Sequence, residues 1–372
     1  MIFLFTCFVF LIYFGLIVAL IYGNVILNKC PHDRSVKNRS AVSVIVPFRN
    51  EKKQLPIIYQ CLKSQEYEQK KREVIFINDH STDGGDIELK QWIVSEPHFK
   101  CLDCKEGQGK KYALNLGIEK AANDLIITTD ADVFFKEQWL DSMVKSYLSV
   151  PTNLLVGPVV MQSGKSFYSA LMQLEFSSLM ATTRGAIGIQ KPILCNGANL
   201  AFSKRLYLKL QPHKKYPGQA SGDDVFLLHE VKRVFPKDAA IHYANRAEAL
   251  VYIKPMENLS EFFHQRLRWG GKSKSYKDRA TIFTGWIVLI ANVWLLALFV
   301  LTFLLGNSFY LLPVFLFKWG LDYCLLRSIP KWMRSGKTFV LSFFLSLIYP
   351  FYLLTVALLS LLIKPKWKER SV

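Results

Sequence analysis

Three long stretches without a charged side chain frame a more polar middle section of the chain. They are residues 1–27, 280–317 and 338–363. An α-helix rises about 1.5 Å per residue, so about 20 apolar residues cross the roughly 30 Å hydrocarbon layer of a membrane. The first stretch lacks the basic start and the small-residue cleavage site of a signal peptide. The pattern predicts a transmembrane helix at 1–28 and two or three more within 280–363.

The middle section has the hydrophobic pattern of an α/β domain. Short β-branched runs at 42–47, 74–77 and 125–129 each end in proline or polar residues and predict buried strands. Between the last two, residues 110–122 carry apolar side chains at helical spacing. Strands that alternate with helices indicate a mostly parallel sheet covered on both faces. Ligands of such sheets bind beyond the carboxyl ends of the strands, so we expect the site there.

These patterns divide the chain into five parts. They are a transmembrane helix at 1–28, the α/β domain at 29–255, an interfacial helix region at 256–279, C-terminal transmembrane helices at 280–363 and a basic tail at 364–372.

The formal net charge of +18 is concentrated beside the apolar stretches. Lys29, Arg34, Lys37 and Arg39 follow the first stretch directly. Basic residues favour the cytoplasmic end of a membrane helix, so we expect an integral, multi-pass protein of the cell (inner) membrane with its α/β domain in the cytoplasm. The basic residues form no recognisable nucleic-acid module, and anionic lipids with an anionic substrate account for the excess. We expect no nucleic-acid partner.

The number of crossings stays open on the sequence alone. Lys318, Asp322 and Arg327 interrupt the last apolar region. Asp322 could pair with either basic residue along a helix, or the segment could be marginal or interfacial. Four crossings would place the basic tail outside, against the preference of basic residues for the cytoplasm.

The seven cysteines fit a reducing compartment. Cys101 and Cys104 form one CxxC pair, and a structural zinc site would need a second pair of ligands at a similar spacing. We therefore expect free thiols.

The first indication of chemistry is a pair of acids, Asp130 and Asp132, directly after the third predicted strand. Two carboxylates one residue apart at a turn can reach one ligand. Together with substrate phosphates they suit a hard divalent cation, Mg²⁺ or Mn²⁺. So short a pattern is also typical of a solvated turn and carries little weight alone.

Further motifs make the chain resemble the family 2 glycosyltransferases. In the family's order they are residues 47–51 (PFRNE), 78–83 (NDHSTD), 109–111 (GKK) with Asn115, 130–132 (DAD), 222–224 (GDD) and 265–269 (QRLRW). The last matches the QxxRW signature of the membrane-bound branch, which includes cellulose, chitin and hyaluronan synthases and ceramide glucosyltransferase. The resemblance covers about residues 42–269. It implies a GT-A fold, a nucleotide-sugar donor, a divalent metal and transfer with inversion.

The resemblance, together with the chemistry of the side chains, assigns the donor end of the site. Asp79 is placed to accept a hydrogen bond from the nucleotide base. The polar rim around that base is completed by Pro47, Arg49 and Glu51. Lys110 and Lys111, at the start of a predicted helix, add positive charge near the phosphates.

Asp224 is the candidate general base, because inverting transfer requires the acceptor hydroxyl to lose its proton as the sugar carbon is attacked. Asp223 would orient Asp224 or the acceptor. The family's usual pair is Glu-Asp, so the Asp-Asp pair leaves the role of Asp223 open. Acids at the start of the predicted helix 225–234 are also typical helix caps.

The QxxRW segment is expected at the diphosphate and the acceptor. Arg268, with the metal on Asp132, would stabilise the negative charge of the leaving diphosphate. Trp269 offers an aromatic face to a sugar ring, and Gln265 can hydrogen-bond the acceptor or the pyrophosphate. The same segment is also typical of a basic amphipathic helix on the membrane surface, and the two interpretations are compatible.

We therefore expect a metal-dependent transferase that moves a sugar onto a lipid, a lipid-linked glycan or a growing polysaccharide. The family's pattern implies a UDP-sugar as the donor. About four spans are few for the channel of a processive synthase. The alternative from another class is a membrane transporter or receptor whose α/β domain only senses nucleotides, and Asp224 with the QxxRW segment counts against it. A glycoside hydrolase would need no nucleotide rim.

Overall fold

The computed structural model describes residues 1–29, 40–164, 166–216, 222–236, 239–305, 311–334, 338–362, 366–367 and 370–371. Arg34, Lys37 and Arg39, on which the predicted orientation rests, lie outside the described residues, as does most of the tail 364–372.

The α/β domain is built on a seven-stranded sheet with the order β3-β2-β1-β4-β8-β6-β9. Its strands are Phe99–Asp103 (β3), Arg72–Asn78 (β2), Val42–Phe48 (β1), Leu125–Thr128 (β4), Leu200–Ser203 (β8), Leu154–Val156 (β6) and Ile241–Tyr243 (β9). The first four strands in this order run parallel, and β8 is antiparallel to both of its neighbours. The predicted α/β fold is confirmed, and the three predicted strands are β1, β2 and β4.

Helices pack around this sheet. They are Leu55–Lys63 (α2), Gly85–Ile93 (α3), Lys110–Lys120 (α4), Trp139–Leu148 (α5), Lys204–Leu210 (α7), Pro212–Lys215 (α8) and Asp223–Val234 (α9). A Cβ atom on Gly117 of α4 would lie 2.6 Å from Cδ1 of Ile77 and 2.7 Å from Cγ2 of Ile45. Because the interior is closely packed, the missing side chain lets α4 approach the strands whose ends carry the site.

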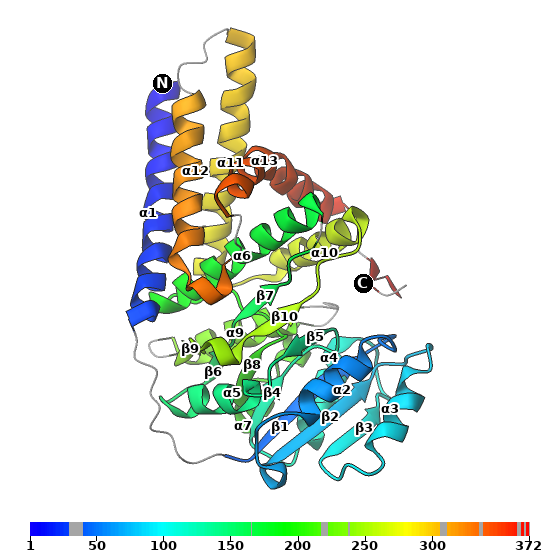
Figure 1. Ribbon diagram of the computed structural model, residues 1–372. Helices are drawn as coiled ribbons and strands as arrows, with labels where there is room; N and C mark the ends of the chain where they lie inside the picture. The colour runs from blue at the N-terminus through cyan, green and yellow to red at the C-terminus, as the bar shows by residue number, and fades with distance from the viewer. Residues whose placement is uncertain are drawn as a thin grey trace.

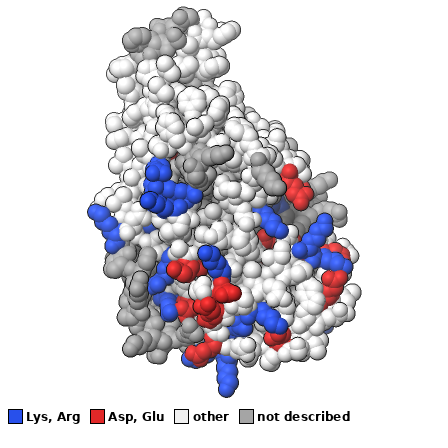
Figure 2. All heavy atoms as spheres, viewed as in Figure 1, with Lys and Arg blue, Asp and Glu red and all other residues white. Residues whose placement is uncertain are grey.

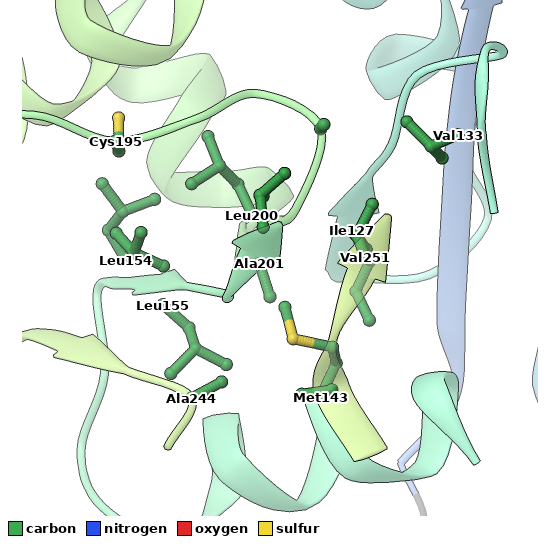
Figure 3. Close-up of a cluster of buried hydrophobic side chains, with 14 of the residues drawn as sticks. Ile127, Val133, Met143, Leu154, Leu155, Cys195, Leu200, Ala201, Ala244 and Val251 are labelled. Carbon is green, nitrogen blue, oxygen red and sulfur yellow. The ribbon is translucent and has the colours of Figure 1, made fainter. Parts of the chain in front are cut away.

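The hydrophobic core continues beneath β4, β6 and β8 (Figure 3). Leu154, Leu155 and Ala201 are completely shielded from solvent, as is Met143 of α5. A three-stranded sheet of Val133–Phe135 (β5), Val251–Ile253 (β10) and Val159–Met161 (β7) adjoins this core. Burial of so much apolar surface is the main favourable contribution to folding, and it fixes the strand ends that present polar residues.

Six further helices form the apolar part and its junction with the α/β domain. They are Ile2–Lys29 (α1), Phe167–Gly188 (α6), Leu259–Lys272 (α10), Arg279–Leu305 (α11), Leu311–Ser328 (α12) and Thr338–Leu362 (α13). In Figure 1, α1, α11 and α12 stand together above the sheets, α13 runs obliquely, and α6 and α10 lie between the bundle and the α/β domain. In Figure 2 the described residues of the upper part of the bundle are uncharged, whereas basic side chains lie at its lower end and charges of both signs gather over the α/β domain.

Within the described residues, three helices are long and apolar enough to cross a membrane, namely α1, α11 and α13. The α12 helix, which holds the ionisable residues, packs against α1. Lys318 Nζ lies 2.8 Å from Asp322 Oδ2, and Tyr13 of α1 donates a hydrogen bond to the other carboxylate oxygen. Asp322 thus pairs with Lys318, one of the two partners that the sequence allowed, and the pair faces protein, as ionisable groups at membrane depth usually do.

A buried arginine joins α6 to α1 and to the α/β domain. Arg184 Nη1 donates to the carbonyl oxygen of Asn24 at 2.9 Å, and Nη2 donates to the amide oxygens of Asn28 and Asn245, both at 2.9 Å. A guanidinium has five donors in a rigid fork, so one side chain can fix several segments at once. The position of α6 relative to the sheets is set in this way.

Candidate active site

A cavity of about 480 Å³ lies at the carboxyl ends of the parallel strands. Its walls come from the ends of β1, β2 and β4, the starts of α4 and α9, the middle of α6, and α10. Twelve of the thirteen site residues predicted from the sequence line it: Pro47, Arg49, Glu51, Asp79, Lys110, Asp130, Asp132, Asp223, Asp224, Gln265, Arg268 and Trp269. The structure therefore brings together residues that are widely separated in the chain.

Lys111 does not line this cavity. Its Nζ donates to the carbonyl oxygen of Tyr216 at 3.0 Å, and burial lowers its pKa. Successive residues of a helix point about 100° apart, so two adjacent lysines at the start of α4 cannot both face the same ligand.

Asp79 is fixed at the donor end of the cavity. Its side chain is 2% exposed, and Oδ1 accepts a hydrogen bond from the backbone N–H of Gly109 at 3.0 Å. Arg49 Nη1 donates to the carbonyl oxygens of Asp79 and His80 at 3.0 and 3.1 Å. These bonds fasten together the loop after β1, the loop after β2 and the start of α4. A base entering this corner would meet a carboxylate that cannot swing away.

A lysine and a carboxylate meet in the middle of the cavity. Lys110 Nζ donates a hydrogen bond to Asp130 Oδ1. Burial by itself lowers the pKa of Lys110, but the charges of Asp130, Asp224 and Asp223 outweigh it and raise the pKa above its ordinary value. Lys110 is therefore a fixed positive charge among four acids, counting Asp132.

The two acids of the GDD motif open α9. Gly222 precedes them with φ of 106°, a conformation that glycine adopts without strain. Asp224 Oδ2 accepts from the backbone N–H of Gly197 at 3.0 Å, and Thr128 at the end of β4 donates to the Gly197 carbonyl at 3.1 Å. A short turn anchored on β4 thus orients Asp224.

Asp223 differs from its neighbour in its surroundings. It lines the cavity and is half-buried, and burial raises its pKa to about 6, while the positive charge of Lys110 opposes the rise. A carboxyl group with this pKa is close to the range that suits acid–base catalysis near neutral pH. Asp223 is therefore suited to exchange a proton near neutral pH, whereas Asp224 is the acid that accepts the hydrogen bond of the Gly197 turn.

The α10 helix forms the side of the cavity that faces the bundle. Asn258 begins it by accepting a hydrogen bond from the Glu261 N–H at 2.9 Å, an ordinary N-cap. Burial lowers the pKa of Arg268 to about 10, and the nearby Asp132 carboxylate opposes the decrease. Arg268 is still protonated at neutral pH, so it offers positive charge beside Asp132.

Several lining residues were not found from the sequence. Lys272 follows Arg268 by one helical turn, so the spacing of α10 could have revealed it. Gly197 acts through its backbone N–H, which no side-chain pattern records. Leu179 and Met180 of α6 form an apolar wall and carry no chemical signature.

The residues present fit a divalent metal held jointly with a diphosphate. Asp130 and Asp132 supply carboxylate oxygens, the ligands that Mg²⁺ and Mn²⁺ prefer. Among the described residues, no group of three or more His, Cys, Asp or Glu side chains could hold an ion. Phosphate oxygens and water would complete the coordination, which is how Mg²⁺ usually binds in nucleotide sites.

Comparison with known proteins finds similarity to glycosyltransferases. The model of the glycosyl transferase family 2 matches residues 43–209. Over 93 residues, a quarter of this chain, the sequence is 32% identical to a bactoprenol glucosyl transferase of Shigella phage SfV. Over 155 residues, 41% of this chain, it is 28% identical to a poly-beta-1,6-N-acetyl-D-glucosamine synthase of Staphylococcus aureus. The matched segments span 30% and 37% of these relatives' lengths.

A solved structure extends the likeness to nearly the whole chain. The mannosyltransferase PcManGT of Pyrobaculum calidifontis, in complex with GDP-Man and Mn²⁺, superposes with a TM-score of 0.62 over 97% of this chain and 99% of its own, at 17% identity. At this identity the likeness establishes the fold. Residues 43–209 are therefore similar to the glycosyl transferase family 2, and the chain has the GT-A fold.

Proposed function

We propose that the protein is an inverting, metal-dependent glycosyltransferase that moves a sugar from a nucleotide sugar, with UDP as the nucleotide, to a lipid-borne acceptor at the membrane. The observation that carries the proposal is the meeting of Asp79, the Asp130/Asp132 pair, Asp224 and Arg268 in one cavity. A protein that only sensed nucleotides would have no use for Asp224 and the α10 residues there.

The donor is proposed to lie across the strand ends. The base sits against Asp79, Arg49 and Glu51, and the diphosphate lies near Lys110 and Arg268. A divalent ion bound by Asp130 and Asp132 would neutralise charge on the diphosphate as the bond to the sugar breaks. Lys110 and Arg268 act on the same charge from the protein side, because fixed cations in an enclosed site lose little to solvent reorganisation.

The transfer step is proposed to invert the sugar carbon. The acceptor oxygen forms the new bond to the anomeric carbon as the bond to the nucleoside diphosphate breaks on the opposite face. Asp224 takes the proton of the acceptor hydroxyl, and the diphosphate leaves with the bonding electron pair. The turn at Gly197 holds Asp224 in place, which lowers the entropic cost of the step.

The acceptor is proposed to be carried by a lipid. Leu179 and Met180 give the cavity an apolar wall on α6, and α6 contacts α1, α12 and α13. An apolar wall continuous with helices able to span a membrane suits an acceptor whose reactive group lies at headgroup level. A processive polymer would instead need a long polar channel. In this arrangement the catalytic domain lies on the cytoplasmic side, where nucleotide sugars are available.

The proposal is tested by incubating the detergent-purified protein with UDP- and GDP-sugars, Mn²⁺ and membrane lipids. The products are then identified by mass spectrometry. We expect the mass of one sugar residue added to a lipid, and an anomeric configuration opposite to that of the donor by NMR. Products with long runs of sugars would favour a processive synthase. Nucleotide binding without any glycosylated product would favour the sensor.

A further inference from the structure

The second residue of the QxxRW segment does not face the cavity. Arg266 is 4% exposed, and its guanidinium forms an ion pair with Glu175 of α6, which is also 4% exposed. Nε donates to Glu175 Oε1 at 3.0 Å and Nη2 donates to Oε2. The two planar groups thus form a buried bidentate pair between α10 and α6.

The same guanidinium contacts both neighbours that line the acceptor side. Its central carbon lies 4.4 Å from the ring centroid of Trp269, and Nη1 donates a hydrogen bond to Gln265 Oε1. Arginine has only donors, so Gln265 must present its amide oxygen to Arg266. The amide nitrogen, a donor, is left for the cavity. Arg266 therefore covers Trp269 and determines which hydrogen-bonding group Gln265 offers to a ligand.

Stability alone gives no reason for this arrangement. A buried ion pair is often no more stabilising than a well-packed apolar pair of the same volume, because both charges lose their hydration. A lysine would keep the charge but lose the planar fork that reaches Glu175, Gln265 and Trp269 together. The pair also reaches the last helix, since Tyr352 of α13 donates to Glu175 Oε1 at 3.3 Å.

We propose that Glu175 and Arg266 are positioning residues that hold Gln265 and Trp269 toward the acceptor, with Tyr352 linking them to α13. The inference rests on the proposed transferase function and goes beyond it by assigning two residues outside the cavity to acceptor recognition. Of the proposed donor contacts, Asp79 and Lys110 lie on other elements and do not depend on this pair, whereas Arg268 shares α10 with Arg266.

The test compares Arg266→Lys and the double variant Glu175→Leu/Arg266→Met with the parent protein. The double variant removes both charges and leaves no unpaired ion, so its thermal midpoint should stay close to that of the parent. We expect both variants to raise the acceptor KM about tenfold or more, because neither keeps the planar fork that contacts Gln265 and Trp269 together. The Kd for UDP should change less than twofold. Asp322→Asn, which removes the carboxylate of the Lys318–Asp322 ion pair on α12, is the control and should keep the parental acceptor KM.

A readout without turnover separates this inference from the proposed function. Hydroxyl-radical footprinting should show more oxidation of Trp269 in both variants than in the parent or in Asp322→Asn. A parental footprint and a parental acceptor KM in the double variant would overturn the inference. An equal rise of the acceptor KM in Asp322→Asn would also overturn it, because it would indicate a general weakening of the packing between the helices. A parent protein that transfers no sugar would count against the proposed function, while the footprint still decides whether the pair positions Trp269.

Discussion

The ammonium group of Lys110 donates a hydrogen bond to Asp130, the first carboxylate of the proposed metal pair. Asp223 and Asp224 also act on the charge of Lys110. Lys110 therefore holds together a group of acids that would otherwise repel one another in an enclosed site. A metal ion at the proposed site would compete with Lys110 for Asp130, so donor phosphates that draw Lys110 toward them would favour entry of the metal.

Replacement of Lys110 should affect nucleotide and metal in opposite directions. Lys110→Met should weaken UDP binding about 10- to 100-fold, because a charge-assisted contact to phosphate is lost. Without nucleotide, the same variant should bind Mn²⁺ more tightly than the parent, as followed by electron paramagnetic resonance. Lys111→Met is the matched comparison. Because Lys111 points away from the cavity, we expect it to change UDP binding much less. Equal losses of UDP affinity in the two variants would show that Lys111 also contacts the donor.

Metal removal should stop the reaction. EDTA should abolish transfer and added Mn²⁺ or Mg²⁺ should restore it, because two carboxylates and a diphosphate would repel one another without a cation. Asp132→Asn should weaken UDP binding mainly when metal is present, as isothermal titration with and without Mn²⁺ would show. Full activity in a chelator would remove the metal from the mechanism.

Asp223 should make the protein less stable at neutral pH than its amide variant. Its folded pKa of about 6 lies above the ordinary value of 3.8, so the folded state binds more protons than the unfolded state between about pH 4 and 6. The charged Asp223 carboxylate therefore lowers the free energy of unfolding. This loss is absent below pH 4, grows between about pH 4 and 6, and amounts to at most about 3 kcal/mol above that range. Asp223→Asn should therefore have the higher thermal midpoint at pH 7, with the difference shrinking toward pH 4. A variant less stable than the parent at pH 7 would show that the charge is well compensated.

Orientation in the membrane can be tested with introduced cysteines in a background without native ones. Val94, on the surface of the α/β domain, is 85% exposed, and the N-terminus lies at the far end of α1 from that domain (Figure 1). A membrane-impermeant maleimide applied to intact cells should label a cysteine added before Met1 and spare Val94→Cys. Labelling of Val94→Cys would place the catalytic domain outside and would argue against a nucleotide-sugar donor.

The parts of the fold that the sequence predicted are those with a strong local pattern. Strands β1, β2 and β4 are apolar runs that end in polar residues, and buried parallel strands require such runs. The start of α4 and the acids of α9 were recognised because a chemical motif coincides with a helix start. The helices long and apolar enough to span a membrane were predicted from length and apolarity. For α12, only the structure shows that its charged pair faces Tyr13.

The remainder depends on contacts between segments far apart in the chain. Glu175 lies in a helix with little amphipathic pattern, and only the packing of α6 against α10 pairs it with Arg266. The Gly197 N–H acts through the backbone and has no sequence signature. Adjacent lysines 110 and 111 look equivalent in the sequence, and the rotation of α4 decides which one faces the cavity. The direction of a side chain follows from three-dimensional packing, which residue type alone does not determine.

The variant Asp224→Asn, measured for both UDP binding and sugar transfer, tests the central claim most directly. The substitution is nearly isosteric, so the fold and the donor site should survive. Removal of a general base should lower the rate of transfer about 10²- to 10⁴-fold, while the Kd for UDP stays close to that of the parent. Arg268→Ala provides the contrast, because it should lose transfer and UDP affinity together. Near-parental turnover of Asp224→Asn would contradict the account and make Asp223, with its pKa of about 6, the next candidate for the base.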